Sequence, residues 1–384
     1  DTAWQQYSGS AGTLVIDNTG TLRKSAGTGQ FEFLHTALNN TGVVEVLAGD
    51  LAFGGDGGTS SGEFRAGIGS EVAFLYGTQT WVEGAHGRGD GAIALRNLNG
   101  SLGGTLSVSG TTVTVARLNL GPLGTLTGNG RLTIAETGSQ WTAGFMTGGG
   151  TTRIAAGADL TVSGASRKYL GNRTLDVQGT LIEASTGDLM DLEGAATLKI
   201  SGVMDIRGDT AWQQYSGSAG TLVIDNAGTL RKSAGTGQFE FLNASLTSTG
   251  TVQVTSGTLR FSNPIVQNGT VLVDAGATLI LGTETILGPF PTPAPLAALA
   301  VNSNARTADA PSLTVAAVAA TPLLAVVSPL PSTVAAPASK VSDSSADERA
   351  GVKRIRASGL TDGKTIVSWR KDLRDALRPF RWSR

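Results

Sequence analysis

Three carboxylates close together in the sequence are the best candidates for chemistry that needs acidic side chains: Asp188, Asp191 and Glu193. In a β-strand, residues two positions apart share a face, so Asp191 and Glu193 would lie side by side. Such a pair could bind Ca²⁺, which prefers oxygen ligands, or cleave glycosidic bonds, which requires paired acids. We favour the simpler interpretation, that these carboxylates point outward into solvent. No other metal or cofactor is predicted.

The tripeptide Arg88-Gly89-Asp90 is a candidate for binding another protein. On an exposed loop it could dock to an integrin-like receptor. It lies in a glycine-rich stretch, residues 84–91, and three residues are a weak signal in a chain with 54 glycines. We favour a plain surface loop, which also accounts for His86.

Trp4 and Trp212 are candidates for stacking on sugars, because each could offer an aromatic ring at the surface. Each is followed three positions later by a tyrosine, Tyr7 or Tyr215. If the two indole rings point inward, they fill the interior of the protein instead. We favour packing over ligand binding for both tryptophans.

Composition excludes or disfavours several kinds of site. The chain has no cysteine, so it holds no disulfide, thiolate metal site or cysteine nucleophile. Its two histidines, His35 and His86, stand alone, and an internal repeat replaces His35 with Asn243. Asp17 and its duplicate Asp225 are interpreted as structural, because a catalytic residue is rarely copied together with its whole repeat.

The elements that would position these residues are short strands preceded by glycine. A Gly-Thr-Leu unit followed by alternating apolar and polar residues recurs along residues 1–288. The alternation places aliphatic side chains on one side of each strand and polar ones on the other. Glycine ahead of each strand would allow a positive φ at a tight corner. The unit begins at Gly12, Gly20, Gly104, Gly124, Gly179, Gly220, Gly228 and Gly257.

An internal duplication favours a stacked architecture. Residues 1–34 return as residues 209–242 with one change, Thr19 against Ala227. Repetition of this kind is typical of stacked units rather than of one closed core. Short strands with glycine corners could form a sandwich, a propeller or a β-helix. The identical start of each unit favours parallel stacking, so we predict an all-β fold, a parallel and right-handed β-helix.

The predicted turns have about 20–26 residues each, within the lengths seen in solenoids. The offset of 208 residues between the copies then corresponds to about eight or nine turns, and residues 1–288 to about a dozen turns. Asp1 stands inside a repeat, so we expect the chain to belong to a longer protein and to adjoin further repeats of it.

Composition divides the chain into three parts. Residues 1–288 hold 51 of the 54 glycines and form the predicted β-helix. Residues 289–345 are rich in proline, alanine and serine, which is typical of an extended linker. Residues 346–384 form a tail with a net charge of +6, in part as a basic amphipathic helix over residues 365–377.

Charge and hydropathy limit the partners. Outside the basic tail the chain carries a net charge of −7, so the β-helix is not expected to bind nucleic acid, which needs cations that neutralise phosphates. The apolar run over residues 313–327 is too short to span a bilayer and contains Pro322. No transmembrane segment is therefore predicted.

The repeat sequence resembles a known class of protein. The run GTLVIDNAGTLRKSAGTG, followed by TSTGTVQVTSGTLRF, is similar to the β-solenoid repeats of large bacterial surface and secreted proteins. These are the filamentous-haemagglutinin-like and autotransporter-passenger-like solenoids, and the likeness covers residues 1–288. The resemblance implies export to the cell surface or beyond it, and structural or adhesive work on glycans or on surface proteins of a host or neighbouring cell.

The sequence thus favours a non-catalytic structural or adhesive solenoid, acting as a stalk or as a binding surface. The rival hypothesis is a polysaccharide lyase or glycoside hydrolase, since such enzymes also use the parallel β-helix. The two differ in one respect that a structure can show. An enzyme of this kind requires acidic side chains that converge in a groove together with an arginine or a lysine.

Overall fold

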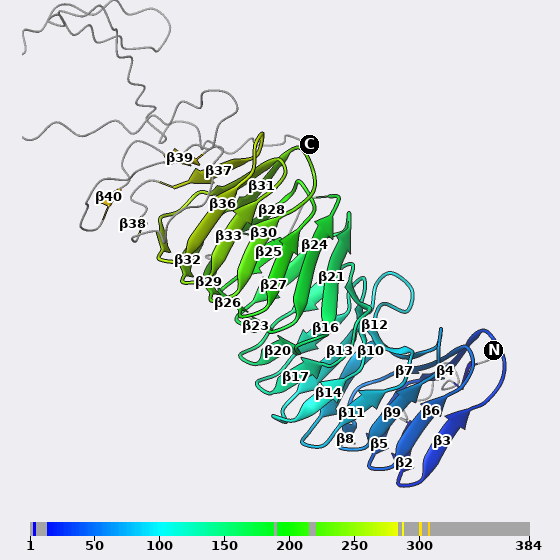
Figure 1. The fold of residues 1–384 in the computed structure, drawn as a ribbon. Helices are drawn as coiled ribbons and strands as arrows, with labels where there is room; N and C mark the ends of the chain where they lie inside the picture. The colour runs from blue at the N-terminus through cyan, green and yellow to red at the C-terminus, as the bar shows by residue number, and fades with distance from the viewer. Residues whose placement is uncertain are drawn as a thin grey trace, which may run out of the picture. The chain divides into compact units, whose positions relative to one another are not determined.

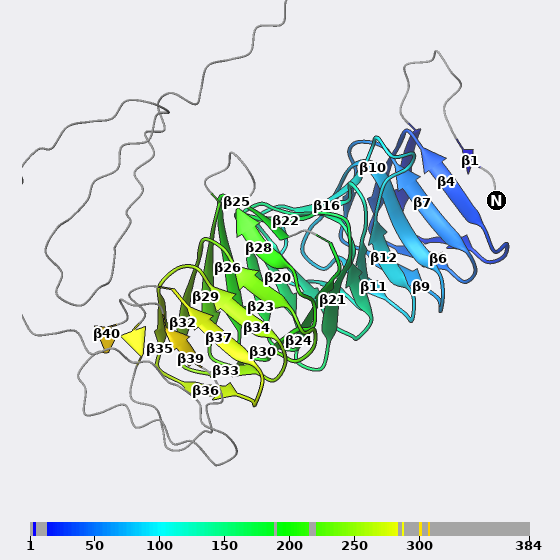
Figure 2. The same ribbon diagram turned by 90° about the horizontal axis from the view of Figure 1, so that it is seen from above.

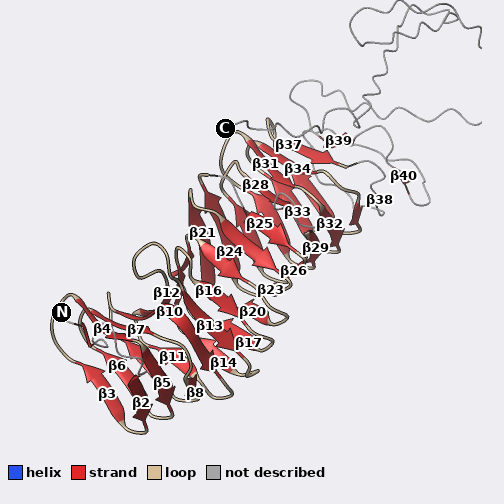
Figure 3. Ribbon diagram, turned by 180° about the vertical axis from the view of Figure 1, so that it is seen from behind, coloured by secondary structure: helices blue, strands red, loops and turns tan. Residues whose placement is uncertain are grey.

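The computed structural model describes residues 3–4, 14–187, 190–214, 220–282, 286–287, 299–301 and 306–307. Throughout this part of the chain the secondary structure consists of strands and the corners between them, with no helix (Figure 3). The predicted linker and basic tail lie almost wholly outside the described residues. The coil belongs to one compact unit, Asp1–Pro329.

The strands form three faces, which we call face A, face B and face C. Face A contains β1 (Ala3–Trp4), β4 (Gln30–Leu34), β7 (Asp50–Gly54), the first half of β10 (Glu71–Trp81), β12 (Ala92–Leu95), β15 (Leu118–Leu120), β18 (Ser139–Trp141), β21 (Asp159–Gly164), β24 (Thr180–Ser185), β27 (Val203–Ile206), β30 (Thr229–Lys232), β33 (Thr251–Val254) and β36 (Thr270–Val273). Face B contains β2 (Leu14–Asn18), β5 (Thr36–Asn40), β8 (Thr59–Ser60), the second half of β10, β13 (Gly104–Val108), β16 (Thr125–Thr127), β19 (Gly144–Met146), β22 (Lys168–Gly171), β25 (Met190–Glu193), β28 (Ala211–Gln214), β31 (Gln238–Phe241), β34 (Thr258–Phe261), β37 (Thr278–Leu281) and β39 (Leu299–Val301).

Face C contains β3 (Thr21–Lys24), β6 (Val43–Val46), β9 (Glu63–Ala66), β11 (His86–Arg88), β14 (Val113–Val115), β17 (Arg131–Ile134), β20 (Thr151–Ile154), β23 (Thr174–Val177), β26 (Ala195–Ile200), β29 (Thr221–Asn226), β32 (Ala244–Ser248), β35 (Ile265–Gln267), β38 (Ile286–Leu287) and β40 (Arg306–Thr307). The chain visits the faces in a fixed order, B, C and A, and every strand pairs in parallel with the strand one turn away. Figure 1 shows β3, β6 and β9 side by side in this way, and Figure 2 shows β6 and β9 again from above.

The prediction of a parallel β-helix is confirmed, and the described coil has about 12 turns. Turn length varies along the coil: the turn that joins the paired Thr105 and Thr125 is short, whereas the turn that joins the paired Ala211 and Glu240 is much longer. Two short strands from the segment expected to be a linker, β39 and β40, continue the ladders of faces B and C.

Alternating side chains build the core. On face B the inward side chains of successive turns stand directly above one another and are completely buried, and one such column is Leu106, Leu126, Met146, Leu170 and Leu192. Columns of this kind merge into one apolar cluster that runs the length of the described coil. Its burial supplies the stabilisation, because free energy is gained roughly in proportion to the apolar area removed from water.

Buried polar side chains hold the carbonyl groups that the corners leave unpaired. Lys232 is fully buried, and its ammonium group donates to Asp209 Oδ1 at 2.6 Å and to the carbonyls of Gly208 and Ala234. Arg173 donates to the Thr147 carbonyl at 2.9 Å, and burial lowers the pKa of its guanidinium to about 10. These interactions satisfy groups that would otherwise be buried without a partner.

The two copies of the duplicated sequence lie on different faces. In the first copy, β2, β3 and β4 occupy faces B, C and A, whereas the same residues in the second copy, β29, β30 and β31, occupy faces C, A and B. The separation is therefore nine turns and one further face, slightly more than the eight or nine turns expected. The shift is possible because each face accepts a short strand with the same apolar alternation.

The copies also differ in burial. Trp4 is 62% exposed and its duplicate Trp212 only 1%, while Leu14 is 40% exposed and Leu222 only 1%. In the second copy the preceding strands β25 to β27 cover these positions. Within the described residues no turn covers the corresponding side of the first copy, so the same sequence occurs once at the surface and once inside.

The glycines that begin the Gly-Thr-Leu units serve a different purpose from the one expected. In the described units φ is positive only at Gly257, so a left-handed corner is not the general reason for glycine. Instead the turns approach so closely that a Cβ would collide with the neighbouring turn. At Gly228 a Cβ would lie 2.2 Å from the Gly202 carbonyl oxygen, and at Gly250 it would lie 2.2 Å from that of Gly228.

Charged side chains on the outside of the coil are paired between turns. Asp205 on face A is 1% exposed and accepts hydrogen bonds from Arg231 Nε at 2.8 Å, Ser233 Oγ at 2.5 Å and Arg207 Nε at 2.9 Å. Burial alone would raise the pKa of Asp205, but the hydrogen bonds from Arg231, Ser233 and Arg207 outweigh it and lower this pKa to about 2.

The duplication provides a matched test of the close approach at the corners. We expect Gly228→Ala to lower the free energy of unfolding by about 1–3 kcal/mol, because the new methyl group meets a backbone carbonyl. Gly20→Ala changes the duplicate residue, where a Cβ meets nothing within 4 Å, and we expect no loss or a small gain in stability. Urea titrations followed by circular dichroism compare the two, and equal losses would contradict the explanation.

The carboxylate of Asp205 predicts a dependence of stability on acid. An unfolded aspartate has a pKa near 3.9, so the stabilisation by a folded pKa of about 2 is nearly complete at pH 5 and is lost as the pH falls toward 2. We expect about 2 kcal/mol of unfolding free energy to disappear over this range, since solvent around the half-exposed arginines screens part of the effect. Asp205→Asn should remove this part of the loss, whereas Asp225→Asn, at an exposed position on face C, should leave it in place. Urea titrations at pH 7, 5 and 2.5 measure the difference.

Candidate functional site

One outward column of side chains on face A contains residues of different size and polarity in successive turns of the coil. In-register pairing aligns, in order, Glu32, Ala52, Ala73, Ala94, Asn119, Gln140, Thr161, Ile182, Asp205, Arg231 and Gln253. The three alanines form a shallow strip where other turns present longer side chains. This strip is buried and belongs to a second, smaller apolar cluster outside the main core.

A loop covers the alanine strip. Residues 97–103 leave face A after β12 and return through a backbone bridge between Asn97 and Gly103, with the Leu98 amide donating to the Leu102 carbonyl. The side chain of Leu98 packs against the cluster of alanines. The loop thus builds a wall at one side of the outward column, next to Asn119.

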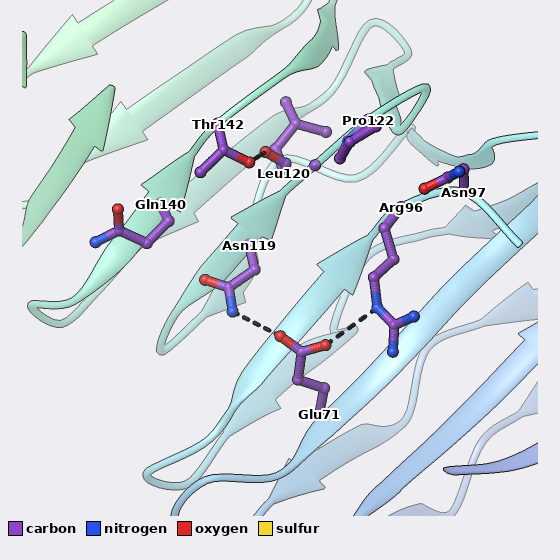
Figure 4. A pocket seen from close by; sticks show the side chains of 9 residues that line it. Glu71, Arg96, Asn97, Asn119, Leu120, Pro122, Gln140 and Thr142 are labelled. Atoms are coloured by element: carbon purple, nitrogen blue, oxygen red, sulfur yellow. Dashed lines mark hydrogen bonds and ion pairs between the residues drawn. The ribbon is translucent and has the colours of Figure 1, made fainter. Parts of the chain in front are cut away.

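Beside this wall lies a pocket of about 360 Å³ (Figure 4). Strands β10, β15 and β18 supply its floor, and the ends of β12 and β15 supply its sides. The lining residues are Glu71, Arg96, Asn97, Asn119, Leu120, Gly121, Pro122, Gln140 and Thr142.

The charged groups of the pocket are bound to one another. Glu71 accepts from Arg96 Nε at 3.2 Å with one oxygen and from Asn119 Nδ2 at 2.7 Å with the other, as Figure 4 shows. Arg96 also donates to Gln30 Oε1 at 2.6 Å and to Asp50 Oδ2 at 3.3 Å. The guanidinium of Arg96 is therefore shared by two carboxylates, and Glu71 is held on both sides.

The amides of the pocket are less committed. Among the described residues, the side chains of Gln140 and Asn97 make no hydrogen bond, and Asn119 uses only its NH₂ group. Thr142 donates to the Leu120 carbonyl at 3.4 Å, which leaves the lone pairs of its hydroxyl oxygen open. A molecule in the pocket would thus find both donors and acceptors on uncharged groups.

The rim of the pocket is apolar and contains an unusual backbone conformation. Leu123, beside the lining residue Pro122, is 39% exposed and has a φ of 59°. The other non-glycine residues with positive φ in the described part are asparagines and a histidine, which tolerate it better. A Cβ on Gly103 would lie 2.7 Å from Leu123 Cβ, so the covering loop and this corner touch.

The carboxylates singled out from the sequence do not take part in this pocket. Glu193 lies on β25 of face B and pairs with Gly171, and Asp191 belongs to the same strand. Asp188 lies outside the described residues. No group of three or more potential metal ligands occurs in the described part of the chain. Ca²⁺ binding by the three acids, the alternative that we did not favour, is not tested by the structure.

The tripeptide Arg88-Gly89-Asp90 lies at the corner between β11 and β12, and all three residues are exposed. Gly89 has a φ of 94°, and its carbonyl accepts from Arg117 at 3.1 Å. His86 at the start of β11 lies 3.3 Å from Glu63 Oε2 rather than on a free loop. Receptor binding by the tripeptide, the alternative that we did not favour, is not tested by the structure.

The two candidate tryptophans have different environments. Trp212 lies inside the coil, where its indole N–H donates to Glu183 Oε2 at 2.9 Å, so stacking on a ligand is excluded for it. Burial raises the pKa of Glu183. Trp4 is exposed and packs edge-on against Phe33, with 5.7 Å between the ring centroids. The expectation of interior packing therefore holds for one copy and is wrong for the other.

The residues of the pocket escaped the sequence-based search. Glu71, Arg96, Asn119 and Gln140 are spread along the chain, and only the pairing of turns brings them together. Their spacing in the sequence indicates that they lie close together, because each of the four residues follows the previous one by about one turn of the coil. Reading this signal requires the exact length of each turn, and turn length varies in this protein.

Comparison with known protein families, with curated proteins and with solved structures gives no match for this chain. No helix in the described residues is long and apolar enough to cross a membrane. The structure alone therefore establishes the class of the protein, a parallel β-solenoid of about 12 turns.

Proposed function

We propose that this chain is a non-catalytic structural or adhesive solenoid of a bacterial surface or secreted protein, and that the pocket on face A is a binding surface. The observation that carries the proposal is the state of the groups in that pocket. Its carboxylate and its guanidinium are bound to each other, whereas the side-chain amides of Gln140 and Asn97 and the carbonyl oxygen of Asn119 have no partner among the described residues. Such a lining is suited to holding a molecule in place.

The architecture supports the structural part of the proposal. Every described turn is held to its neighbours by parallel strand ladders and by buried aliphatic columns. Side chains on such a scaffold keep fixed positions, since their rotamers are restrained by the turns on either side. The proposed location at the cell surface or outside the cell is supported by the resemblance of the repeats to surface and secreted solenoids.

One observation favours the rival function. Glu71 and Arg96 share a pocket with Asp50 close by, and a lyase or hydrolase uses acids and an arginine in one groove. Against this, Arg96 is occupied by two carboxylates and so is not free to bind the carboxylate of an acidic sugar. Glu71 accepts hydrogen bonds on both oxygens, which leaves it poorly placed to exchange a proton with a substrate.

Two assays on the full chain test this proposal. We expect binding on a panel of immobilised glycans and surface proteins, and no release of unsaturated or reducing sugar ends when uronate polymers are incubated with the protein and Ca²⁺. Product formation would overturn the proposal, and its loss in Glu71→Gln would assign the activity to this pocket. Glu240→Gln, which removes an ion-paired carboxylate on face B, is the matched control and should behave like the unchanged protein.

A further inference from the structure

We infer that the pocket on face A binds a neutral, hydroxyl-rich sugar unit of a glycan. This inference rests on the proposed function, because it names the ligand class of the same surface. It is carried by three features of the pocket: its charge, the arrangement of its amides and the conformation of its rim.

The charge of the pocket disfavours acidic ligands. Arg96 is the one cation among its lining residues, and it lies within 3.3 Å of both Glu71 and Asp50. A uronate or a phosphate would have to compete with these two carboxylates for the guanidinium. It would also lie close to their negative charges, which disfavours a second anion at this distance. A ligand without charge meets neither obstacle.

The amides provide a matching set of hydrogen bonds. The carboxylate of Glu71 only accepts, so the NH₂ group of Asn119 must face it, and the carbonyl oxygen of Asn119 is turned away. Gln140, one turn further along the outward column, offers both a donor and an acceptor. Sugar hydroxyls also donate and accept, so one sugar unit can satisfy both residues at once.

The rim supplies the apolar contact. Pro122 lines the pocket and Leu123 follows it directly in the chain, while Leu102 on the covering loop is 48% exposed. A left-handed φ is unfavourable for a leucine, and burial does not offset the strain because Leu123 is 39% exposed. Glycine is used at most other positive-φ corners of this coil. A contact between Leu123 and the carbon-bound hydrogens of a sugar ring would explain why this positive-φ position holds a leucine instead of a glycine.

The size of the pocket agrees with this ligand class. At about 360 Å³ it falls at the lower end of the range for small-molecule sites. The outward column continues past Gln140 to Thr161, so further units of a glycan chain can lie along face A. The inference is therefore a neutral oligosaccharide with one unit seated in the pocket.

Calorimetric titration of the full chain tests this inference. The neutral probes are cello-, xylo- and galacto-oligosaccharides, and the acidic probes are oligogalacturonides. We expect binding of at least one neutral probe and weaker or no binding of the acidic ones. Gln140→Ala should weaken binding about tenfold, the usual effect of losing ligand hydrogen bonds. It should leave the fold intact, because the Gln140 side chain has no partner in the described residues.

Two further variants keep the test interpretable. Leu123→Gly should also weaken binding, while the stability of the protein stays equal or rises because the strained φ is relieved. Gln253→Ala changes the same residue type in the same column five turns beyond Gln140, outside the pocket, and should bind like the unchanged protein.

The outcomes separate this inference from the proposed function. Neutral-sugar binding that survives both Gln140→Ala and Leu123→Gly would overturn the pocket assignment and leave an adhesive solenoid in place. A preference for the acidic probes would overturn the ligand class. Absence of binding to every sugar would overturn the inference, whereas only catalytic product formation would overturn the non-catalytic role.

Discussion

The structure depends on how closely successive turns approach one another at the corners. At Gly228 and Gly250 the neighbouring carbonyl oxygen lies only 2.2 Å from the place a Cβ would occupy. Parallel strands require this spacing to be uniform, since a gap at a corner would open the ladders on both adjoining faces. Columns of glycine, such as Gly202, Gly228 and Gly250, therefore allow successive turns to approach closely at this corner.

Uniform stacking then decides what the outer surface can do. In-register turns place equivalent side chains in columns, so a charge can find its partner one turn away, as Asp205 does with Arg231. Where the column on face A contains alanines, the outer surface has room for a loop. Leu98 of the loop of residues 97–103 packs there together with Leu34 and Tyr76, and the surface is irregular at this place. The pocket lies beside this loop because the loop interrupts the regular outer surface of the coil.

The fold could be predicted from the sequence because a β-helix depends on the local alternation of apolar and polar residues, which the sequence displays directly. Leu106 and Val108, two positions apart and preceded by glycine, predict a short half-buried strand, and many such strands with the same start predict parallel stacking. The prediction that these glycines provide positive φ was wrong for most of them. Their role is to avoid a collision between a Cβ and the neighbouring turn, which cannot be predicted before the turns are aligned. The same limit hid Asn119 and Gln140, whose neighbours depend on turn lengths that vary along the coil. Trp4 and Trp212 share a sequence and differ only in what covers them.

The displaced duplicate shows how such a protein can change its surface. Because the second copy is rotated by one face relative to the first, recombination between repeats need not conserve a whole number of turns. A copied segment carries its outward side chains to a new side of the coil axis. Unequal crossing-over in the gene can thus move a surface patch around the coil as well as lengthen it. The interior tolerates this because every face is built from the same alternation.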